Sequence, residues 1–353
     1  MRSCTAALAF ALALVVWHAH PAAQTSLADP CDSRTPERIV AIGDVHGAYD
    51  RFVAILRAAS VLDARDRWIG GRTVLVQTGD VLDRGPDSRR VLDLLRRLER
   101  DASRAGGRVH ALLGNHEVMR MIGDWRYVSA GEFAAFRTSG SADIRERAYA
   151  IVREGAVTRA RAEQRPHDEA AFRTQFLSDI PLGFIEMRQA FGPAGEYGRW
   201  LRDRPAAARV NGILFVHGGI TAETAAMGCA GINAAVRRDI RTEDVTLEAA
   251  LTMFPSSETG PLWDRTLAET PESELAPAVA AILQTLDARA IVIGHTVATG
   301  FLITSRAGGR VIQIDTGMLG ATSYPGGVPS ALEMRGDAMT AIYLDRREPL
   351  PRR

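Results

Sequence analysis

The stretch TVLVQTGDVLDRG (residues 73–85) decides the fold of this chain. It is a short aliphatic run that leads directly into a glycine-marked motif with two aspartates. The same order recurs at IVAIGDVHG (residues 39–47). A buried strand that ends in a glycine turn is typical of open α/β sheets, whose ligand sites lie at the carboxyl ends of the strands. The two stretches therefore predict strands that bring acidic and histidine side chains to one edge of a sheet.

Three further motifs follow in the second and third parts of the chain: GNHE (residues 114–117), HGG (217–219) and GHT (294–296). HGG and GHT come directly after the aliphatic runs ILFV and AIVI, whereas GNHE follows the looser run VHALL. Hard divalent metals require oxygen and imidazole ligands that are held by rigid elements. One such motif arises easily by chance, but the ordered set predicts a two-metal active site.

The rest of the pattern predicts an α/β core. Helices are expected near residues 49–59 and 88–100, so that strand and helix alternate in the first half. Three strand-like pieces near the C-terminus follow one another without helices between them: residues 311–314, 330–334 and 339–344. Such consecutive strands indicate an antiparallel continuation, and hence two mixed sheets packed together with helices outside.

On these motifs the chain resembles the calcineurin-like metallophosphoesterases, specifically the PPP type of phosphatase. The stretches LLGNHEVMRMIGDWRYVSAGEF (residues 112–133), GPLWDR (260–265) and IDTGM (314–318) are similar to the Shewanella-like branch. The resemblance runs from about Arg38 to about Leu344. It implies a four-layer αββα sandwich of two mixed sheets.

The resemblance also implies a role for each motif residue. The implied metal ligands are carboxylates, imidazoles and one amide: Asp44, His46, Asp80, Asn115, His217 and His295. Asp44 and His46 would hold the first metal, and Asp80 would bridge the two metals. The amide and the two later histidines would hold the second metal.

The same resemblance makes His116 the general acid and Asp83 the carboxylate that orients it. Arg84 matches the arginine that binds the phosphoryl oxygens. Arg265 could also reach the phosphate, because arginine makes bidentate contacts to phosphate. The alternative for Arg265 is a surface residue paired with Asp264.

The chemistry of phosphate esters supports a dinuclear site. Two divalent cations about 3.5–4 Å apart neutralise the anionic ester and lower the pKa of bound water. We expect a one-step hydrolysis in which a hydroxide that bridges the metals attacks phosphorus. The proposed ligand set contains no cysteine, which argues against a structural zinc site. Manganese, iron and zinc all suit a mixed nitrogen and oxygen set.

Two departures from the familiar Ser/Thr phosphatases bear on the substrate. Leu113 stands where they carry an arginine before GNHE, and IDTGMLGATSYPGG (residues 314–327) replaces their SAPNY-like loop. Both fit the Shewanella-like branch, some of whose members prefer phosphotyrosine, so a phosphorylated protein or a small phosphate ester is the expected substrate. A diadenosine-tetraphosphatase-like hydrolase shares several motifs and remains the alternative. A non-catalytic metal-binding module is more remote, because no ligand and no acid is lost.

Residues 117–211 are arginine-rich, helical in periodicity and interrupted by prolines. Because this segment lies between two ligand-bearing motifs, we expect a helical insertion that caps the metal edge. A solvated helical decoration away from the site is the alternative. Trp125 and Tyr127 would then be either an aromatic wall for a substrate ring or anchors that hold the cap on the core.

The first 28 residues have the order of a secretory signal peptide: Arg2, an apolar run over residues 6–17, then small and polar residues. The run is shorter than the ~20 residues of a spanning helix, so no stable membrane insertion is expected after cleavage. The expected order is a linker at 29–37, the catalytic domain at 38–345 and a disordered tail at 346–353. The location would be periplasmic or secreted, where Cys31 and Cys229 could either pair or stay free.

Charge excludes one class of partner. The 353 residues carry 43 basic and 42 acidic side chains, for a net charge of +1. Such a balance gives no general attraction to nucleic acid, so no nucleic-acid partner is expected.

Overall fold

The computed structural model describes residues 31–242, 245–320 and 323–351. The expected signal peptide lies outside these residues. Within them, no helix has both the length and the apolar character needed to cross a membrane.

The core is a sandwich of two six-stranded mixed sheets. The first sheet has the order β1 (Asp32–Ser33), β5 (Ala207–Val210), β6 (Ile213–Val216), β7 (Ala290–Ile293), β9 (Val311–Gln313) and β8 (Thr304–Arg306). The second has the order β12 (Arg347–Pro349), β11 (Ala338–Ile342), β10 (Ala331–Arg335), β2 (Ile39–Ile42), β3 (Val74–Gln77) and β4 (Arg108–Ala111). The α/β sandwich of two mixed sheets that the sequence predicted is confirmed.

The central strands are buried on both faces, which explains their continuous aliphatic sequences. In β2, Ile39 and Ala41 pack into the core between the sheets, together with Phe215 of β6. The alternate residues Val40 and Ile42 belong to the second hydrophobic cluster, which includes helices α1 (Tyr49–Ala58) and α2 (Ser88–Arg104). β2 pairs in parallel with β3, and β3 pairs in parallel with β4, so all three end at the same edge.

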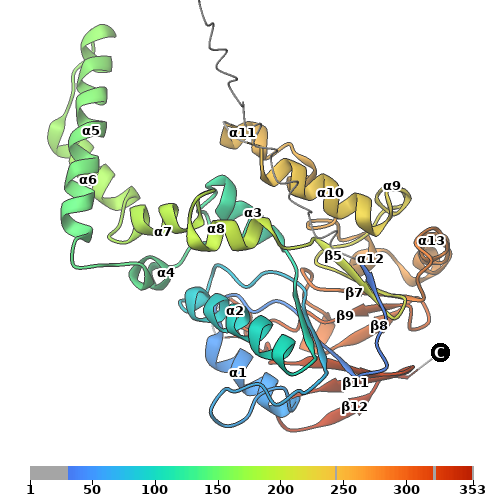
Figure 1. Ribbon diagram of the computed structural model, residues 1–353. Helices are drawn as coiled ribbons and strands as arrows, with labels where there is room; N and C mark the ends of the chain where they lie inside the picture. The colour runs from blue at the N-terminus through green and yellow to red at the C-terminus, as the bar shows by residue number, and fades with distance from the viewer. Residues whose placement is uncertain (1–30, 243–244, 321–322, 352–353) are drawn as a thin grey trace, which may run out of the picture.

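Further helices accompany the first sheet. They are α9 (Ala222–Ala226), α10 (Gly228–Ile240), α11 (Leu247–Ala250), α12 (Thr266–Glu269) and α13 (Glu272–Thr285). Two short 3₁₀ helices, η1 (Phe254–Ser256) and η2 (Thr299–Phe301), join the loops. Helix α10 packs against β5, and Figure 1 shows α10 and α13 on the far side of the molecule from α1 and α2.

The insertion is helical, but only part of it lies near the body. It contains α3 (Asn115–Ile122), α4 (Ala130–Ala135), α5 (Ser141–Ala162), α6 (Glu169–Asp179), α7 (Phe184–Phe191) and α8 (Glu196–Arg202). In Figure 1, α5 and α6 form a hairpin that projects away from the sandwich. The last residues of the predicted insertion, Ala207–Val210, were expected to be helical, yet they form β5. They do so because β6 and β1 offer backbone partners on both sides.

The C-terminal residues were expected to be disordered, and this expectation is wrong for the described part. Arg347 to Pro349 form β12, which pairs antiparallel with β11. The strand has exposed, charged side chains, so its order comes from backbone pairing and side-chain contacts. Arg347 donates to the Ala58 carbonyl at 2.8 Å and lies 3.6 Å from the Glu333 carboxylate.

The two cysteines left open by the sequence form a disulfide. The Cα atoms of Cys31 and Cys229 are 5.9 Å apart, and the bond joins positions separated by 198 residues. It ties the strand β1 at the start of the described chain to the beginning of α10.

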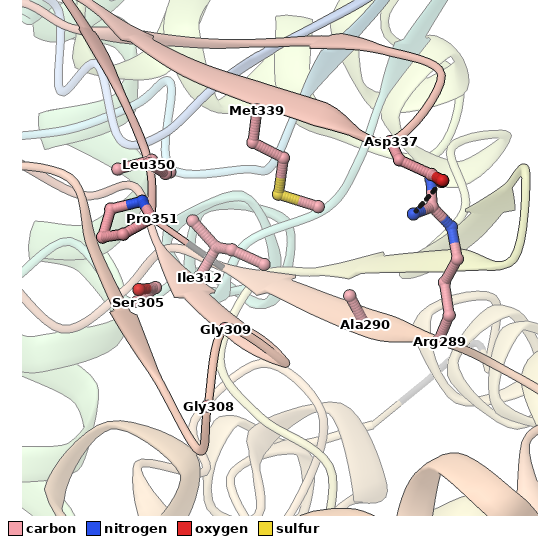
Figure 2. A pocket seen from close by; sticks show the side chains of 10 residues that line it. All are labelled: Arg289, Ala290, Ser305, Gly308, Gly309, Ile312, Asp337, Met339, Leu350 and Pro351. Carbon is pink, nitrogen blue, oxygen red and sulfur yellow. Dashed lines mark hydrogen bonds and ion pairs between the residues drawn. The ribbon is translucent and has the colours of Figure 1, made fainter. Parts of the chain in front are cut away.

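A cavity of about 260 Å³ lies between the two sheets, lined by side chains that include Ile312, Met339 and Leu350 (Figure 2). At its rim Arg289 and Asp337 form an ion pair at 3.2 Å. Arg289 precedes the amino end of β7, so the cavity opens at the edge of the sandwich opposite to the glycine-marked motifs.

Candidate metal centre

The five motifs lie together at the carboxyl ends of five strands, as the sequence predicted. GDVHG follows β2, GDVLDRG follows β3, GNHE follows β4, HGG follows β6 and GHT follows β7. The motif loops are in contact with one another, both between the two sheets and within the first sheet. His217 Nδ1 lies 3.0 Å from the Thr78 carbonyl of the other sheet, and Gly294 donates its backbone N–H to the His217 carbonyl at 2.8 Å.

Glycine is required at two motif positions because carboxylates approach the backbone closely. A Cβ atom at Gly114 would lie 2.3 Å from Asp80 Oδ1, and one at Gly294 would lie 2.4 Å from Asp44 Oδ1. Asp80 itself has a φ of 55°, a left-handed conformation that non-glycine residues adopt at a cost. Such strain is concentrated where a site must hold side chains in one geometry.

The predicted ligands of the second metal converge. His217 Nε2 lies 3.3 Å from Asp80 Oδ1 and 2.9 Å from the amide oxygen of Asn115. That oxygen is also 3.1 Å from His295 Nδ1. Because His217 Nδ1 donates to the Thr78 carbonyl, its Nε2 presents a lone pair. Several acceptor atoms therefore face one another, which a bound cation would resolve.

The predicted ligands of the first metal also meet. His46 Nε2 lies 3.9 Å from Asp44 Oδ2 and 3.7 Å from Asp80 Oδ2. His46 Nδ1 donates to the Leu82 carbonyl at 2.8 Å, which frees Nε2. Asp44 Oδ1 accepts a hydrogen bond from the backbone N–H of His295 at 3.0 Å. The buried Oδ2 of Asp44 has no hydrogen-bond partner among the described residues. Such an oxygen is costly unless a ligand satisfies it.

The electrostatics of the cluster favour cations. Burial would raise the pKa of Asp80, but His217 and His116 hold it well below its usual range. Burial would lower the pKa of His217, yet the carboxylates of Asp80 and Asp44 outweigh burial and raise it to about 9. Without a cation the carboxylates therefore favour a proton on this ring, and a metal at Nε2 would displace that proton. Burial, together with the nearby carboxylates of Asp315 and Asp80, raises the pKa of Asp44 well above its usual range, and bound cations would offset this crowding of acidic groups. The residues fit two divalent metals that share Asp80.

Within the described chain, possible ligand atoms form two triads that share one carboxylate: His46, Asp80 and His116, and Asp80, His217 and His295. The first triad includes His116, the predicted general acid. The contacts of His116 therefore decide whether it is an acid or a metal ligand. His116 Nε2 lies 3.3 Å from the Arg84 guanidinium, a positive charge that disfavours a metal ion at this nitrogen. We therefore assign the first triad's histidine ligand to His46 alone.

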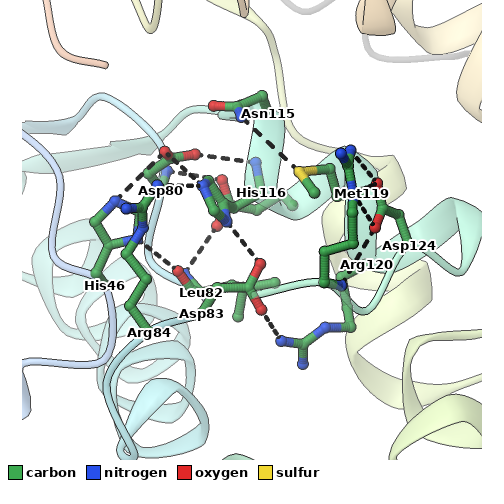
Figure 3. A network of polar contacts seen from close by, with 12 residues as sticks. His46, Asp80, Leu82, Asp83, Arg84, Asn115, His116, Met119, Arg120 and Asp124 are labelled. Carbon is green, nitrogen blue, oxygen red and sulfur yellow. Dashed lines mark hydrogen bonds and ion pairs between the residues drawn. The ribbon is translucent and has the colours of Figure 1, made fainter. Parts of the chain in front are cut away.

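The contacts of His116 suit a proton donor (Figure 3). Its Nδ1 lies 2.6 Å from Asp83 Oδ2, and its backbone N–H donates to Asp80 Oδ1 at 3.0 Å. Burial lowers the pKa of His116, but the carboxylates of Asp80 and Asp83 outweigh burial and raise it. Asp83 thus fixes the Nδ1 edge of the ring, and Nε2 is directed to the ligand cluster, which is the orientation that a proton donor requires.

Arg84 lies at the mouth of the cluster between two tyrosine rings. Its guanidinium carbon is 5.1 Å from the ring centre of Tyr127 and 5.5 Å from that of Tyr324. Tyr324 also stacks on His46 at 6.0 Å. The position suits a phosphoryl-binding arginine, as the resemblance implied.

Arg265 lies close to the same edge. Its Nη1 donates to the His295 carbonyl at 3.3 Å and to Thr296 Oγ1 at 2.8 Å. Asp264, the partner considered in the alternative, accepts instead from the backbone N–H and the hydroxyl of Thr266. The arginine is therefore attached to the GHT loop next to a predicted ligand.

Sequence reasoning missed several residues that build the site. Glu117, the last residue of GNHE, accepts backbone N–H groups from Gly114, Asp80, Val81 and Leu82 at 2.7–3.2 Å. Its place at the third position of α3, where a glutamate can accept the backbone N–H of the N-cap residue, is a helix-start signal that could have revealed it. Tyr324 had no such signal, because only the folded loop brings it to His46.

A family comparison agrees with this geometry. The model of the calcineurin-like phosphoesterases matches residues 37–298. The chain belongs to this family, and it is a metal-dependent phosphoesterase with a buried site of histidine and aspartate ligands.

Within the family the chain is similar to the Shewanella-like protein phosphatases. It is 30% identical over 321 residues to Shewanella-like protein phosphatase 2 of Arabidopsis thaliana, with 87% of this chain and 77% of the relative covered. Identity to Shewanella-like protein phosphatase 1 of Plasmodium berghei is 27%, over 87% and 74% of the two chains. The crystal structure of a cold-active protein-tyrosine phosphatase from a psychrophilic Shewanella superposes with a TM-score of 0.67 and 26% identity, covering 91% and 82%.

Proposed function

We propose that the protein hydrolyses phosphate monoesters on proteins, with phosphotyrosine among its substrates. The observation that carries the proposal is the buried pair of His116 and Asp83 beside the ligand cluster. The leaving group of a phosphate ester is an alkoxide or a phenoxide, which needs a proton. The leaving group of a phosphate anhydride is a phosphate, which is already a stable anion. A positioned acid therefore favours ester hydrolysis over cleavage of a dinucleotide polyphosphate.

Two divalent cations, manganese, iron or zinc, would supply charge neutralisation and activate water when they are bound. Asp44, His46 and Asp80 would hold one cation, and Asp80 would also contribute to the other. Asn115 and the two later histidines complete that second set.

The chain's own groups would then act on the ester. Arg84 binds the phosphoryl oxygens from the mouth of the cluster, where its guanidinium is steadied by the two tyrosine rings. His116 transfers its Nε2 proton to the leaving oxygen. Asp83 keeps the other nitrogen protonated, so the ring presents the correct edge.

An aromatic substrate fits the mouth of the site. Tyr127 is 42% exposed, and its ring lies 5.1 Å from the His116 ring. Tyr324 lies on the other side of Arg84. The two rings offer apolar faces to a phenyl group. The name of the Shewanella relative, a protein-tyrosine phosphatase, points the same way.

A direct comparison of substrates tests this proposal. The metal-loaded protein is offered a phosphotyrosine peptide, a phosphoserine peptide and diadenosine tetraphosphate. We expect a higher kcat/KM on a phosphomonoester, with the phosphotyrosine peptide fastest. Faster hydrolysis of the dinucleotide would replace the proposal with its alternative.

We also propose that the protein acts outside the cytoplasm, in the periplasm or after secretion. The order of residues in the first 28 positions supports this, and so does the disulfide between Cys31 and Cys229, since such bonds persist in oxidising compartments. Fractionation of cells, with the N-terminus of the mature protein read by mass spectrometry, tests it. Recovery of the uncleaved chain in the cytoplasm would contradict export.

A further inference from the structure

Arg120 of α3 is a buried arginine at the junction of the insertion and the site. It is 2% exposed, and its side chain is the largest among the fully buried ones of the described chain. Burying a guanidinium is costly unless carboxylates compensate it. The carboxylates that contact the Arg120 guanidinium therefore indicate its role.

Two carboxylates hold the guanidinium. Arg120 Nη2 donates to Asp83 Oδ1 (Figure 3). The same nitrogen donates to Glu132 Oε1 at 3.0 Å. Nη1 lies 3.2 Å from the Met187 sulfur of α7. One cation is thus shared between a carboxylate of the site and a carboxylate of the insertion.

The same contacts fix Asp83 on all sides. Its Oδ1 is bound by Arg120, and its Oδ2 accepts the His116 Nδ1–H at 2.6 Å. Its backbone N–H donates to Glu132 Oε1 at 3.1 Å. Because Asp83 has a left-handed φ of 70°, an external contact is needed to hold it there.

Glu132 is itself locked in α4. Its second oxygen accepts the Ser129 N–H at 3.0 Å, in a capping box at the start of the helix. The Ser129 hydroxyl in turn donates to the Gly85 carbonyl, two residues after Asp83, at 3.1 Å. Helix α4 and the loop that carries Asp83 are therefore joined at two points.

We propose that Arg120 and Glu132 are positioning residues for the general acid. They hold the Asp83 carboxylate in one orientation, and Asp83 in turn fixes the direction of the His116 ring. Neither side chain touches the ligand cluster, so they act through Asp83 and not on the substrate. The base of the insertion would thus serve proton donation. The inference rests on the proposed function, because it assigns the acid its supports.

The kinetic test compares Arg120→Met and Glu132→Gln with the wild type on two phosphate esters. An activated aryl ester needs little protonation, whereas an alkyl ester needs a proton on its leaving oxygen. We expect kcat to fall roughly tenfold to a hundredfold on the alkyl ester, the usual cost of losing an outer partner of a functional group. The loss on the aryl ester should be clearly smaller, with KM unchanged on both.

A double-mutant cycle decides whether the effect passes through the acid. In a His116→Asn background, Arg120→Met should cause no further loss of kcat on the alkyl ester. Losses that multiply would overturn the inference, as would equal losses on both esters. Glu132→Gln keeps the shape of the site and carries the same test if Arg120→Met does not fold.

Arg38→Met is the matched control for a lost arginine. Arg38 is partly buried and pairs with Glu333 at 3.0 Å at the other edge of the sandwich. The Arg38→Met substitution should lower Tm without changing the ratio of kcat on the alkyl ester to kcat on the aryl ester.

A structural readout separates this inference from the proposed function. In the zinc-loaded wild type, the proton between His116 Nδ1 and Asp83 should give a strongly downfield NMR resonance. The resonance should be lost or broadened in Arg120→Met and in Glu132→Gln. An unchanged resonance in both variants would contradict the positioning role even if the enzyme proved to act on another ester. Failure of the wild type on every phosphomonoester would reject the function alone.

Discussion

Glu117 shows how a single side chain can hold together two motifs of the site. Its two carboxylate oxygens accept four backbone N–H groups, three of them from the loop that begins with Asp80. Each N–H is buried and would be costly without an acceptor. The residue therefore holds in place Asp80, the aspartate that the two triads share.

Replacing Glu117 with Gln tests this role. An amide offers one acceptor oxygen and turns an NH₂ group towards buried donors, so we expect a loss of unfolding free energy of about 1–3 kcal/mol. Metal affinity should fall about tenfold to a hundredfold, because the support of a ligand is lost. Urea unfolding and metal titration measure the two effects. Glu348→Gln, an exposed change on β12, should alter neither, and an unchanged metal affinity in Glu117→Gln would refute the role.

The meeting of the predicted ligand residues could be foreseen from sequence, because each lies in a short motif directly after or close behind an aliphatic strand. Arg120 could not, since a helical arginine is normally solvated. Its burial depends on Glu132 and Met187, which lie 12 and 67 residues further along the chain. Tyr324 lies in a loop without a recognisable pattern, and its contact with His46 exists only in the folded protein.

At the scale of elements, the insertion divides into two parts with different contacts. Trp125 packs against Phe184 of α7 at 5.1 Å and over Arg120 of α3, so it joins two helices at the base of the insertion. Tyr127, two residues later, faces Arg84 and remains exposed. The hairpin of α5 and α6 projects away from both (Figure 1). Only the base of the insertion therefore lies where it can influence a substrate.

This division predicts different consequences for the two aromatic residues. Tyr127→Ala should lower kcat/KM for aryl phosphates by up to roughly tenfold, because an aromatic contact is worth about 0.5–1.5 kcal/mol. Small alkyl phosphates should be hardly affected. Trp125→Ala should instead lower Tm, with equal effects on both substrate types. If Tyr127→Ala affects both types equally, Tyr127 is an anchor and not a substrate wall.

Two short strands away from the sheet centres mark where prediction from sequence fails. Strands β5 and β12 lack the aliphatic runs that revealed β2 and β3, and β12 is exposed and charged. Their order comes from pairing with β6 and β11. Backbone pairing is independent of side-chain pattern, so the aliphatic central strands could be predicted whereas β5 and β12 could not.

For the whole molecule, the disulfide joins the beginning of the described chain to α10, 198 residues away in sequence. Closing so long a loop restricts the unfolded chain and should stabilise the fold by about 2–4 kcal/mol. Cys229→Ser should therefore lower Tm, and reductant should lower the Tm of the wild type but not that of the variant. The same Tm with and without reductant would show that the bond contributes nothing.

The central claim is that the sandwich brings five motifs together into a dinuclear metal centre that shares Asp80. The most direct measurement is the metal content of the purified protein, determined by inductively coupled plasma mass spectrometry for the wild type and for Asp80→Asn. We predict two divalent ions per wild-type chain and the loss of both in Asp80→Asn, because Asp80 lies within reach of His46 and of His217. A wild type that binds a single ion, or an Asp80→Asn variant that keeps both ions, would contradict the account.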